Sequence, residues 1–278
     1  MVGGGAMILL AAFTVFGNML GIDSDDSDRT SRLLVNFQIT FWAAGGLGVL
    51  ALAVTDVVQR RDAEAGLLVL WVLGTFLFTA FCNWTVNGRS ILPMAPAVGI
   101  LIARRLDKKF PIAQTIWPRG AIIGLTASAV LSLLVLHADF LFARATRESA
   151  REACSELRTR TDGRTLWFEG HWGFQYYMEA GGARAIDLAH PALKPGDTFV
   201  EPANNAGLHS SRLDTRTGST VFSVSKSSFL ATTDKSVGAG FYASIDGPLP
   251  FAFGRVPPER TVVFDFNGLL PAPVPPTP

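Results

Sequence analysis

Apolar runs free of charged residues alternate with short charged segments through the first half of the chain. The runs cover residues 1–22, 33–55, 65–88, 90–103 and 120–138. A helix needs about 20 apolar residues to cross the roughly 30 Å hydrocarbon core of a bilayer, and four runs have about that length. The shorter run at 90–103 has Arg89, Arg104 and Arg105 at its ends, whose apolar stems can extend to the headgroups. The pattern predicts an α-helical multi-span membrane bundle of about five transmembrane helices.

A signal peptide is the alternative interpretation of residues 1–22. The run has no positively charged start, and "GNML" is not an A-x-A cleavage site. We therefore prefer a membrane span for this segment. Because membrane sequence follows Met1 at once, we expect the chain to correspond to part of something larger.

The charges between the runs indicate an orientation. The loop "GIDSDDSDRTSR" has four Asp, whereas basic residues follow the second and fourth runs: Arg60, Arg61, Arg104, Arg105, Lys108, Lys109 and Arg119. Cytoplasmic loops of membrane proteins are rich in Lys and Arg. The sequence therefore predicts a multi-pass protein of the cytoplasmic membrane with its C-terminal domain outside. Arg144, Arg147 and Arg151 then lie outside against the rule, which is weak for long translocated domains.

The second half of the chain mixes charged residues, Gly and Pro at the frequencies of a water-soluble domain. Residues 140–160 have apolar positions at helical spacing, and "HWGFQYYMEAGG" is typical of a short helix ended by two glycines. Five short apolar segments predict strands: "RTLWFEG", "ARAIDL", "PGDTFVEP", "STVFSVS" and "TVVFDF". The sequence thus predicts a transmembrane region at 1–138, a small α/β or α+β extracytoplasmic domain at 139–268, and a Pro-rich tail at 269–278.

Composition and motifs exclude several classes of protein. Of the 278 residues 49% are hydrophobic and only 17% are charged, and the net charge of +1 gives no basic patch for nucleic acid. Cys82 and Cys154 are the only cysteines, so neither a disulfide framework nor a zinc site is indicated, although one bridge between them stays an alternative. We find no nucleotide-binding or hydrolase motif and predict no cofactor and no metal site.

Arg89 stands with Asn87 at the outer edge of the run at 90–103. One interpretation is a membrane-interface anchor. The other is a substrate-binding group, because a guanidinium can hold a phosphate or carboxylate with two parallel hydrogen bonds. Pro93 and Pro96 free backbone carbonyls, so we expect a kinked helix that is packed inside the bundle and does not face lipid.

A second candidate site lies in "FEGHWGFQYYMEAGG". His171, Trp172, Gln175 and Tyr176 can stack on a sugar ring and bond its hydroxyl groups. The alternative is a buried aromatic core, because aromatic residues at helical spacing are commonly core. The loop "GFYASIDGPLPFAFG" has Gly and Pro between aromatic residues, and we expect it to lie on the membrane or on the helical bundle.

"NGRSILPMAPAVGILIARRL" resembles the "GRYLLPxxPxxxxL" pattern in late spans of glycosyltransferase family 39, the dolichyl-phosphate-mannose protein mannosyltransferase and aminoarabinose transferase type. "FEGHWGFQYYMEAGGARAI", "PGDTFVEP" and "GFYASIDGPLPFAFG" resemble the extracytoplasmic C-terminal region of bacterial members. The resemblance covers about residues 87–266, and Ser90 stands where the family usually has an aromatic residue.

The resemblance implies transfer of a sugar from a polyprenyl-phosphate donor to an extracytoplasmic glycan or lipid acceptor. The family has its catalytic acidic residue in the first outer loop of a longer bundle, and the Asp residues of "DSDDSD" do not match that motif. We therefore assign no catalytic residue, leave open whether the chain alone is an enzyme, and expect it to be a C-terminal portion for which a separate N-terminal half is one candidate partner. The alternative is a non-catalytic membrane-anchored glycan-binding or assembly protein.

Overall fold

The computed structural model describes residues 29–83, 87–109, 119–160, 165–187, 192–204 and 216–266. Contacts between residues divide the chain into two compact units. The first, here called the helical unit, extends to His137 and includes Phe229–Val256; the second, the sheet unit, consists of Ala138–Ser228 and the residues from Pro257 onward. The division falls within one long helix, α6 (Arg119–Arg160).

The helices of the helical unit follow the predicted apolar runs. Helix α2 spans Arg29–Arg60, α3 spans Ala63–Leu77 and continues as a π-helix at Phe78–Cys82, and α4 spans Gly88–Ile91. A 3₁₀ turn at Leu92–Met94 separates α4 from α5 (Ala95–Lys109). The expected kink corresponds to this 3₁₀ interruption, since Pro93 cannot donate a helical hydrogen bond. The expected packing inside the bundle is not shown, because Leu92, Ile100 and Ile102 are exposed.

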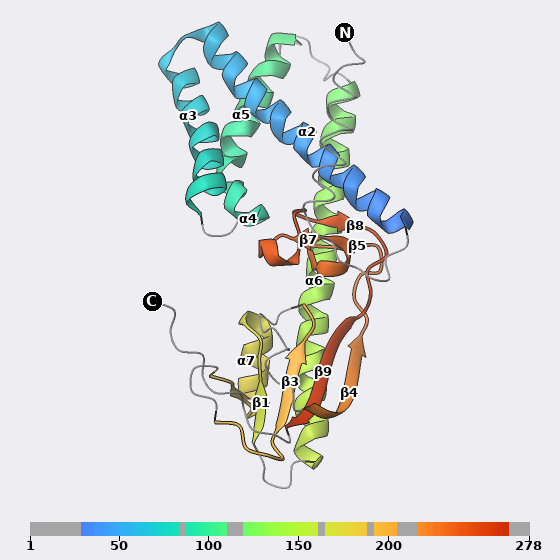
Figure 1. Ribbon diagram of the computed structural model, residues 1–278. Coiled ribbons are helices and arrows are strands. Elements are labelled where there is room, and N and C mark those ends of the chain that lie inside the picture. Colours follow the sequence, from blue (N-terminus) through green and yellow to red (C-terminus); the bar gives the residue numbers. More distant parts are fainter. Residues whose placement is uncertain are drawn as a thin grey trace. The chain divides into compact units, whose positions relative to one another are not determined.

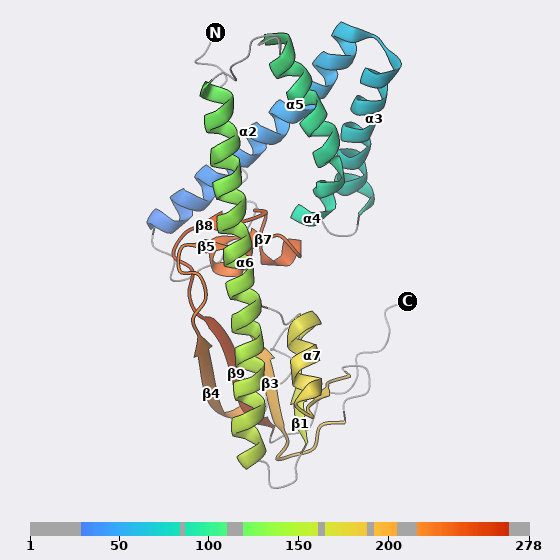
Figure 2. The same ribbon diagram turned by 180° about the vertical axis from the view of Figure 1, so that it is seen from behind.

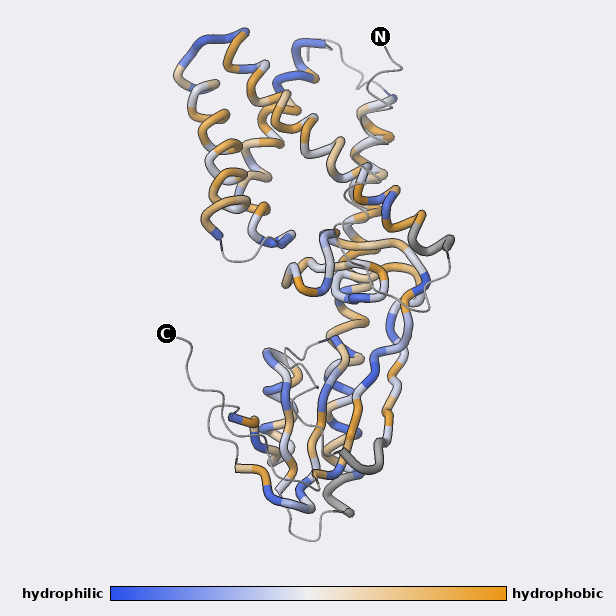
Figure 3. The backbone as a smooth tube through the Cα atoms, viewed as in Figure 1, coloured by the Kyte–Doolittle hydropathy of each residue, from blue (hydrophilic) through white to orange (hydrophobic). Residues whose placement is uncertain are grey.

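Among the residues that the structure describes, three helices are long and apolar enough to cross a membrane: Leu33–Arg60, Ala63–Cys82 and Arg119–Glu156. They correspond to three of the predicted spans. The predicted span at 90–103 is helical but does not meet this length and hydropathy, and the one at 1–22 lies outside the described residues. Five spans are therefore not confirmed. Figure 3 shows hydrophobic residues along α2 and α3 and hydrophilic residues at the turn between them and at the C-terminal end of α5.

Helices α2, α3 and α5 pack on one another through small and aliphatic side chains. Ala53, Ala65, Val72 and Ala97 are fully buried, and Leu68 and Leu101 are nearly so. Alanine at helix contacts lets the backbones approach closely, which is a common device of membrane helix pairs.

Residues 229–256 form a small cap on the N-terminal part of α2 (Figure 1). Two antiparallel strand pairs build it: β5 (Leu230–Ala231) with β8 (Ala252–Phe253), and β6 (Thr233–Asp234) with β7 (Ala239–Gly240). Val35 of α2 lies in the apolar core of this cap. The loop "GFYASIDGPLPFAFG" was expected to lie on the membrane or on the helical bundle, and the structure places it on helix α2 of the bundle. Gly240 is required in the cap, because a Cβ there would collide with the backbone of Gly247.

The sheet unit contains one mixed sheet with strand order β2-β1-β3-β9-β4. All five predicted strands are present: β1 Leu166–Phe168, β2 Arg184–Ala185, β3 Thr198–Pro202, β4 Arg216–Val224 and β9 Glu259–Phe266. Strand β1 is parallel to β2 and β3, whereas β9 is antiparallel to β3 and β4. Helix α7 (Trp172–Ala180) joins β1 to β2, as parallel neighbours require.

The C-terminal part of α6 and helix α7 cover the same face of this sheet (Figure 2). Their contact with the sheet is the largest buried apolar cluster of the unit, with Phe168, Phe174, Met178 and Val200 inaccessible to solvent. Trp167, Phe199 and Phe264 form a second cluster on the opposite face. The helices are therefore held on the sheet by burial, and the outer face of α7 is left to solvent.

Candidate functional site

The first predicted site lies at the start of α4, where Asn87 is the N-cap. Its Oδ1 accepts hydrogen bonds from the Ser90 amide at 3.0 Å and the Ser90 hydroxyl at 2.8 Å, and its Nδ2 donates to the Tyr242 carbonyl at 3.3 Å. Asparagine is among the preferred N-cap residues because its oxygen satisfies amides of the first helical turn. Asn87 is buried, so it positions the backbone around Arg89.

Ser90 is the centre of the hydrogen bonds at this helix start. Its hydroxyl also accepts from Asn83 Nδ2 at 2.9 Å, and its carbonyl accepts from the Thr79 hydroxyl at 3.1 Å. The Thr79 bond joins α4 to the π-helical end of α3.

Arg89 combines a fixed backbone with an unpaired side chain. Its amide donates to the Phe241 carbonyl at 3.4 Å, and the preceding Gly88 contacts the Phe241 ring so closely that a Cβ there would collide with it. The side chain is exposed and makes no hydrogen bond or ion pair with any residue that the structure describes. A guanidinium presented this way can bind an anionic group with two hydrogen bonds.

The second predicted site lies on the outer face of α7. Its aromatic residues divide between two environments: Phe174 and Met178 are fully buried, whereas 61% of Trp172 and 67% of Tyr176 is exposed. Trp172 and Tyr176 are four residues apart and therefore lie on one face of the helix. The predicted aromatic core thus involves other members of the motif, and these two rings are accessible to a ligand.

His171 and Gln175 flank the two exposed rings. His171 is the exposed N-cap residue of α7, with its ring centre 6.2 Å from that of Trp172. Gln175 Nε2 donates to Glu179 Oε1 at 2.8 Å, a bond between exposed neighbours on the helix. Trp172 itself has a φ of 51°, in the left-handed region. Imidazole and amide groups beside two rings match the chemistry of a sugar, with its apolar faces and hydroxyl rim.

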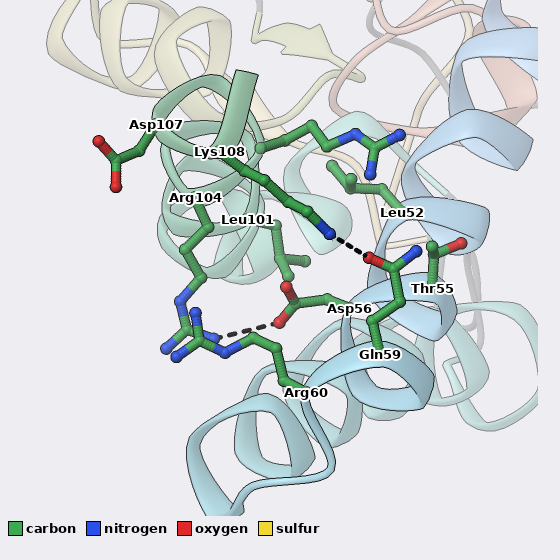
Figure 4. A pocket seen from close by; sticks show the side chains of 10 residues that line it. Leu52, Thr55, Asp56, Gln59, Arg60, Leu101, Arg104, Asp107 and Lys108 are labelled. Carbon is green, nitrogen blue, oxygen red and sulfur yellow. Dashed lines mark hydrogen bonds and ion pairs between the residues drawn. The ribbon is translucent and has the colours of Figure 1, made fainter. Parts of the chain in front are cut away.

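A polar cluster at the C-terminal ends of α2 and α5 was not predicted as a site. Arg104 bonds Asp56 at 3.1 Å, and Lys108 Nζ donates to Gln59 Oε1 at 3.0 Å (Figure 4). Arg104 also bonds Glu64 at 2.6 Å. From the sequence, Arg104 and Lys108 are expected only to mark a cytoplasmic loop, with the Arg104 stem extending to the headgroups. Their spacing of four residues places them on one helix face, which is the signal that could have indicated the cluster.

Within the described ranges, no group of three or more His, Cys, Asp or Glu residues could hold a metal ion. Cys82 is exposed and Cys154 is buried, and the structure shows no disulfide between them. Two candidate sites accessible to a ligand therefore remain: the unpaired guanidinium of Arg89 in the helical unit and the two exposed rings of α7 in the sheet unit.

Comparisons with protein-family models, with curated proteins and with solved structures found no match. The resemblance to family 39 glycosyltransferases therefore depends on the sequence patterns alone.

Proposed function

We propose that the chain is part of a membrane glycosyltransferase-like system and that Arg89 binds the phosphate of a polyprenyl-phosphate sugar donor. The observation that supports this role is the state of Arg89: its backbone is fixed by the Asn87 cap and by Phe241, while its guanidinium is exposed and has no partner among the described residues. An interface anchor needs only a charge on a flexible stem. A fixed backbone adds orientation, which favours bidentate binding of phosphate.

In this proposal the sheet unit lies outside the cytoplasmic membrane and its α7 face contacts the sugar acceptor. The support is the pair of exposed rings at Trp172 and Tyr176, with His171 and Gln175 beside them. The assignment concerns binding only, and no residue of the chain is given the role of catalytic base.

The test is binding of a short-chain polyprenyl phosphate to the purified full chain in a phosphate-free detergent. A charged hydrogen bond contributes about 1.5–3 kcal/mol, so Arg89→Ala should weaken binding by about tenfold to a hundredfold. Arg89→Lys should recover only part, because an ammonium keeps the charge without the planar fork. Arg255→Ala is the matched control and should leave the affinity unchanged, because Arg255 is also an exposed arginine of the helical unit without a partner in the described part of the chain. Equal affinity of wild type and Arg89→Ala would refute the donor role.

The second candidate function is that of a non-catalytic membrane-anchored glycan-binding protein. The exposure of Trp172 and Tyr176 favours it independently of Arg89. A panel of soluble oligosaccharides, measured by calorimetry against the full chain, tests this role. If oligosaccharides bind, if Trp172→Ala and Tyr176→Ala each weaken binding, and if Arg89→Ala leaves both ligand types unaffected, the glycan-binding function replaces the transferase-like one.

A further inference from the structure

A cavity of about 280 Å³ lies between the C-terminal halves of α2 and α5 in the helical unit (Figure 4). Leu52 and Leu101 line its apolar part. Four basic side chains line its polar part: Arg60, Arg104, Arg105 and Lys108. Two carboxylates, Asp56 and Asp107, also border it, so the lining has two more positive than negative charges. The lining of the cavity is thus amphipathic and has an excess of cationic donors.

Arg104 has a structural role that accounts for part of this cluster. Its two ion-pair partners belong to different helices, Asp56 to α2 and Glu64 to α3, so the guanidinium ties α5 to both. Only 19% of the Arg104 side chain and 14% of that of Asp56 is exposed, whereas 74% of that of Glu64 is. The Arg104–Asp56 pair is therefore shielded, and the Glu64 charge is largely screened by solvent.

The ion pairs of Arg104 do not account for the positions of Arg105 and Lys108 beside the cavity. Arg105 is exposed and has no hydrogen bond or ion pair with the residues described. Lys108 donates to Gln59, a neutral acceptor, so its positive charge has no counterpart within the same ranges. In Figure 4 Asp107 points away from Gln59 and Asp56. Two cations therefore border the cavity without a carboxylate that neutralises them, which is the arrangement that binds an anion.

The position of the cavity indicates which anion. Two membrane-length helices meet here, because Leu33–Arg60 ends and Ala63–Cys82 begins on either side of a two-residue turn. When such helices cross a bilayer, their ends lie at the depth of the headgroups, and basic pockets between helices at that depth bind lipid phosphates. Drug-sized ligands occupy cavities of roughly 300–1,000 Å³, so this smaller cavity fits a headgroup better than a nucleotide.

We infer that this cavity binds the phosphate group of an anionic membrane lipid, with Arg105 and Lys108 as its ligands and Leu52 and Leu101 against the first carbons of the lipid. Arg104 positions the helices and does not bind the phosphate, because its guanidinium is already occupied by Asp56 and Glu64. The site is separate from Arg89, which precedes α5 at its opposite end.

The experiment titrates the purified full chain, in dodecylmaltoside, into acyl-labelled phosphatidylglycerol and follows fluorescence anisotropy. A basic residue near the membrane surface contributes about 1 kcal/mol, so Arg105→Ala and Lys108→Ala should each raise the apparent Kd about fivefold. Lys109→Ala is the matched control: it removes the same charge one residue along α5 but does not border the cavity. Its Kd should equal that of the wild type. All three residues are exposed, so the variants should keep the wild-type Tm without lipid.

Competition distinguishes the source of the phosphate. Unlabelled phosphatidylglycerol should displace the probe, whereas phosphatidylcholine, inorganic phosphate and glycerol 3-phosphate should not at the same concentration. If the two soluble phosphates compete as well as the lipid, the phosphate site stands and a soluble ligand replaces the lipid. Equal weakening by Lys108→Ala and Lys109→Ala would show diffuse surface attraction and overturn the site, as would the absence of binding.

Discussion

Replacing Gln38 should weaken the attachment of the cap formed by residues 229–256 to helix α2. Gln38 is 8% exposed and lies in an apolar span, where a polar side chain needs a partner. Its Nε2 donates to the Phe253 carbonyl at 2.8 Å, and its Oε1 accepts from the Phe253 amide at 2.6 Å. The side-chain amide thus pairs with the edge of β8 as a peptide group of a neighbouring strand would.

The size of the effect follows from these two bonds. A neutral hydrogen bond contributes about 1 kcal/mol net, and an unsatisfied buried group costs about 1–3 kcal/mol. Phe253 is half-buried, so water can partly replace the lost partner, and we take the lower estimate. Gln38→Leu should then destabilise the attachment by about 2 kcal/mol, which corresponds to about thirtyfold more of the detached state. Gln38→Glu should have a similar effect, because a carboxylate would face the Phe253 carbonyl.

Hydrogen exchange of the full chain in detergent, read by mass spectrometry, measures this change. Peptides from residues 229–256 should exchange about thirtyfold faster in Gln38→Leu if exchange occurs through local opening. Asn36→Leu is the control, since it makes the same substitution two residues away on α2 at a side chain with no hydrogen bond to the described residues. Equal exchange in the two variants would show that apolar packing on Val35 alone holds the cap.

Three further predictions concern the two units and the topology. Lys226→Met should destabilise the sheet unit by about 3–5 kcal/mol, because Lys226 and Glu259 are 3% exposed and 2.8 Å apart, and adding Glu259→Gln should restore part; chemical unfolding followed by tryptophan fluorescence measures both. The Ala65 amide donates to Asp62, the N-cap of α3, and lowers the pKa of its carboxyl. The stabilisation that the Asp62 carboxylate gives is therefore present above the unfolded-state pKa and lost as the pH falls through the lowered folded-state pKa. The Tm difference between wild type and Asp62→Ala should shrink in acid, and a constant difference would contradict this. Alkaline phosphatase fused after Phe266 should be active and a fluorescent protein that matures only in the cytoplasm should be dark there; the opposite pair of results would reverse the proposed orientation.

The strands of the sheet were predictable because each is a local signal. Short apolar segments such as "LWF" and "TVVFDF" stand between Gly, Pro and Asp, and such a pattern needs no distant partner. The strand order was not predictable. Strand β9 lies between β3 and β4, and this order pairs Thr198 of β3 with Asp265 of β9. The cap of 28 residues, Phe229–Val256, is inserted between β4 and β9 in the sequence. Strand pairing between residues so far apart in the sequence cannot be predicted from a short sequence segment.

The candidate sites show the same limit. The exposure of Trp172 and Tyr176 depends on which side of α7 meets the sheet, and the spacing of the aromatic residues fits either orientation. Arg104 was expected to extend to the headgroups, but it bonds Asp56 and Glu64 on two other helices. Those carboxylates are 48 and 40 residues away in the sequence, so only the packing of α5 on α2 and α3 brings them together.

Trp172 has a left-handed backbone conformation, which lowers the stability of the start of α7, while its side chain belongs to the proposed sugar-binding face. A bulky residue at a φ of 51° costs on the order of 1–3 kcal/mol, whereas glycine adopts that conformation freely. Trp172→Gly should therefore relieve this strain, and the ring that it deletes is exposed and contributes little to the core. Directed evolution for heat resistance alone would favour that exchange, and it would remove one of the two rings that we propose contact a sugar.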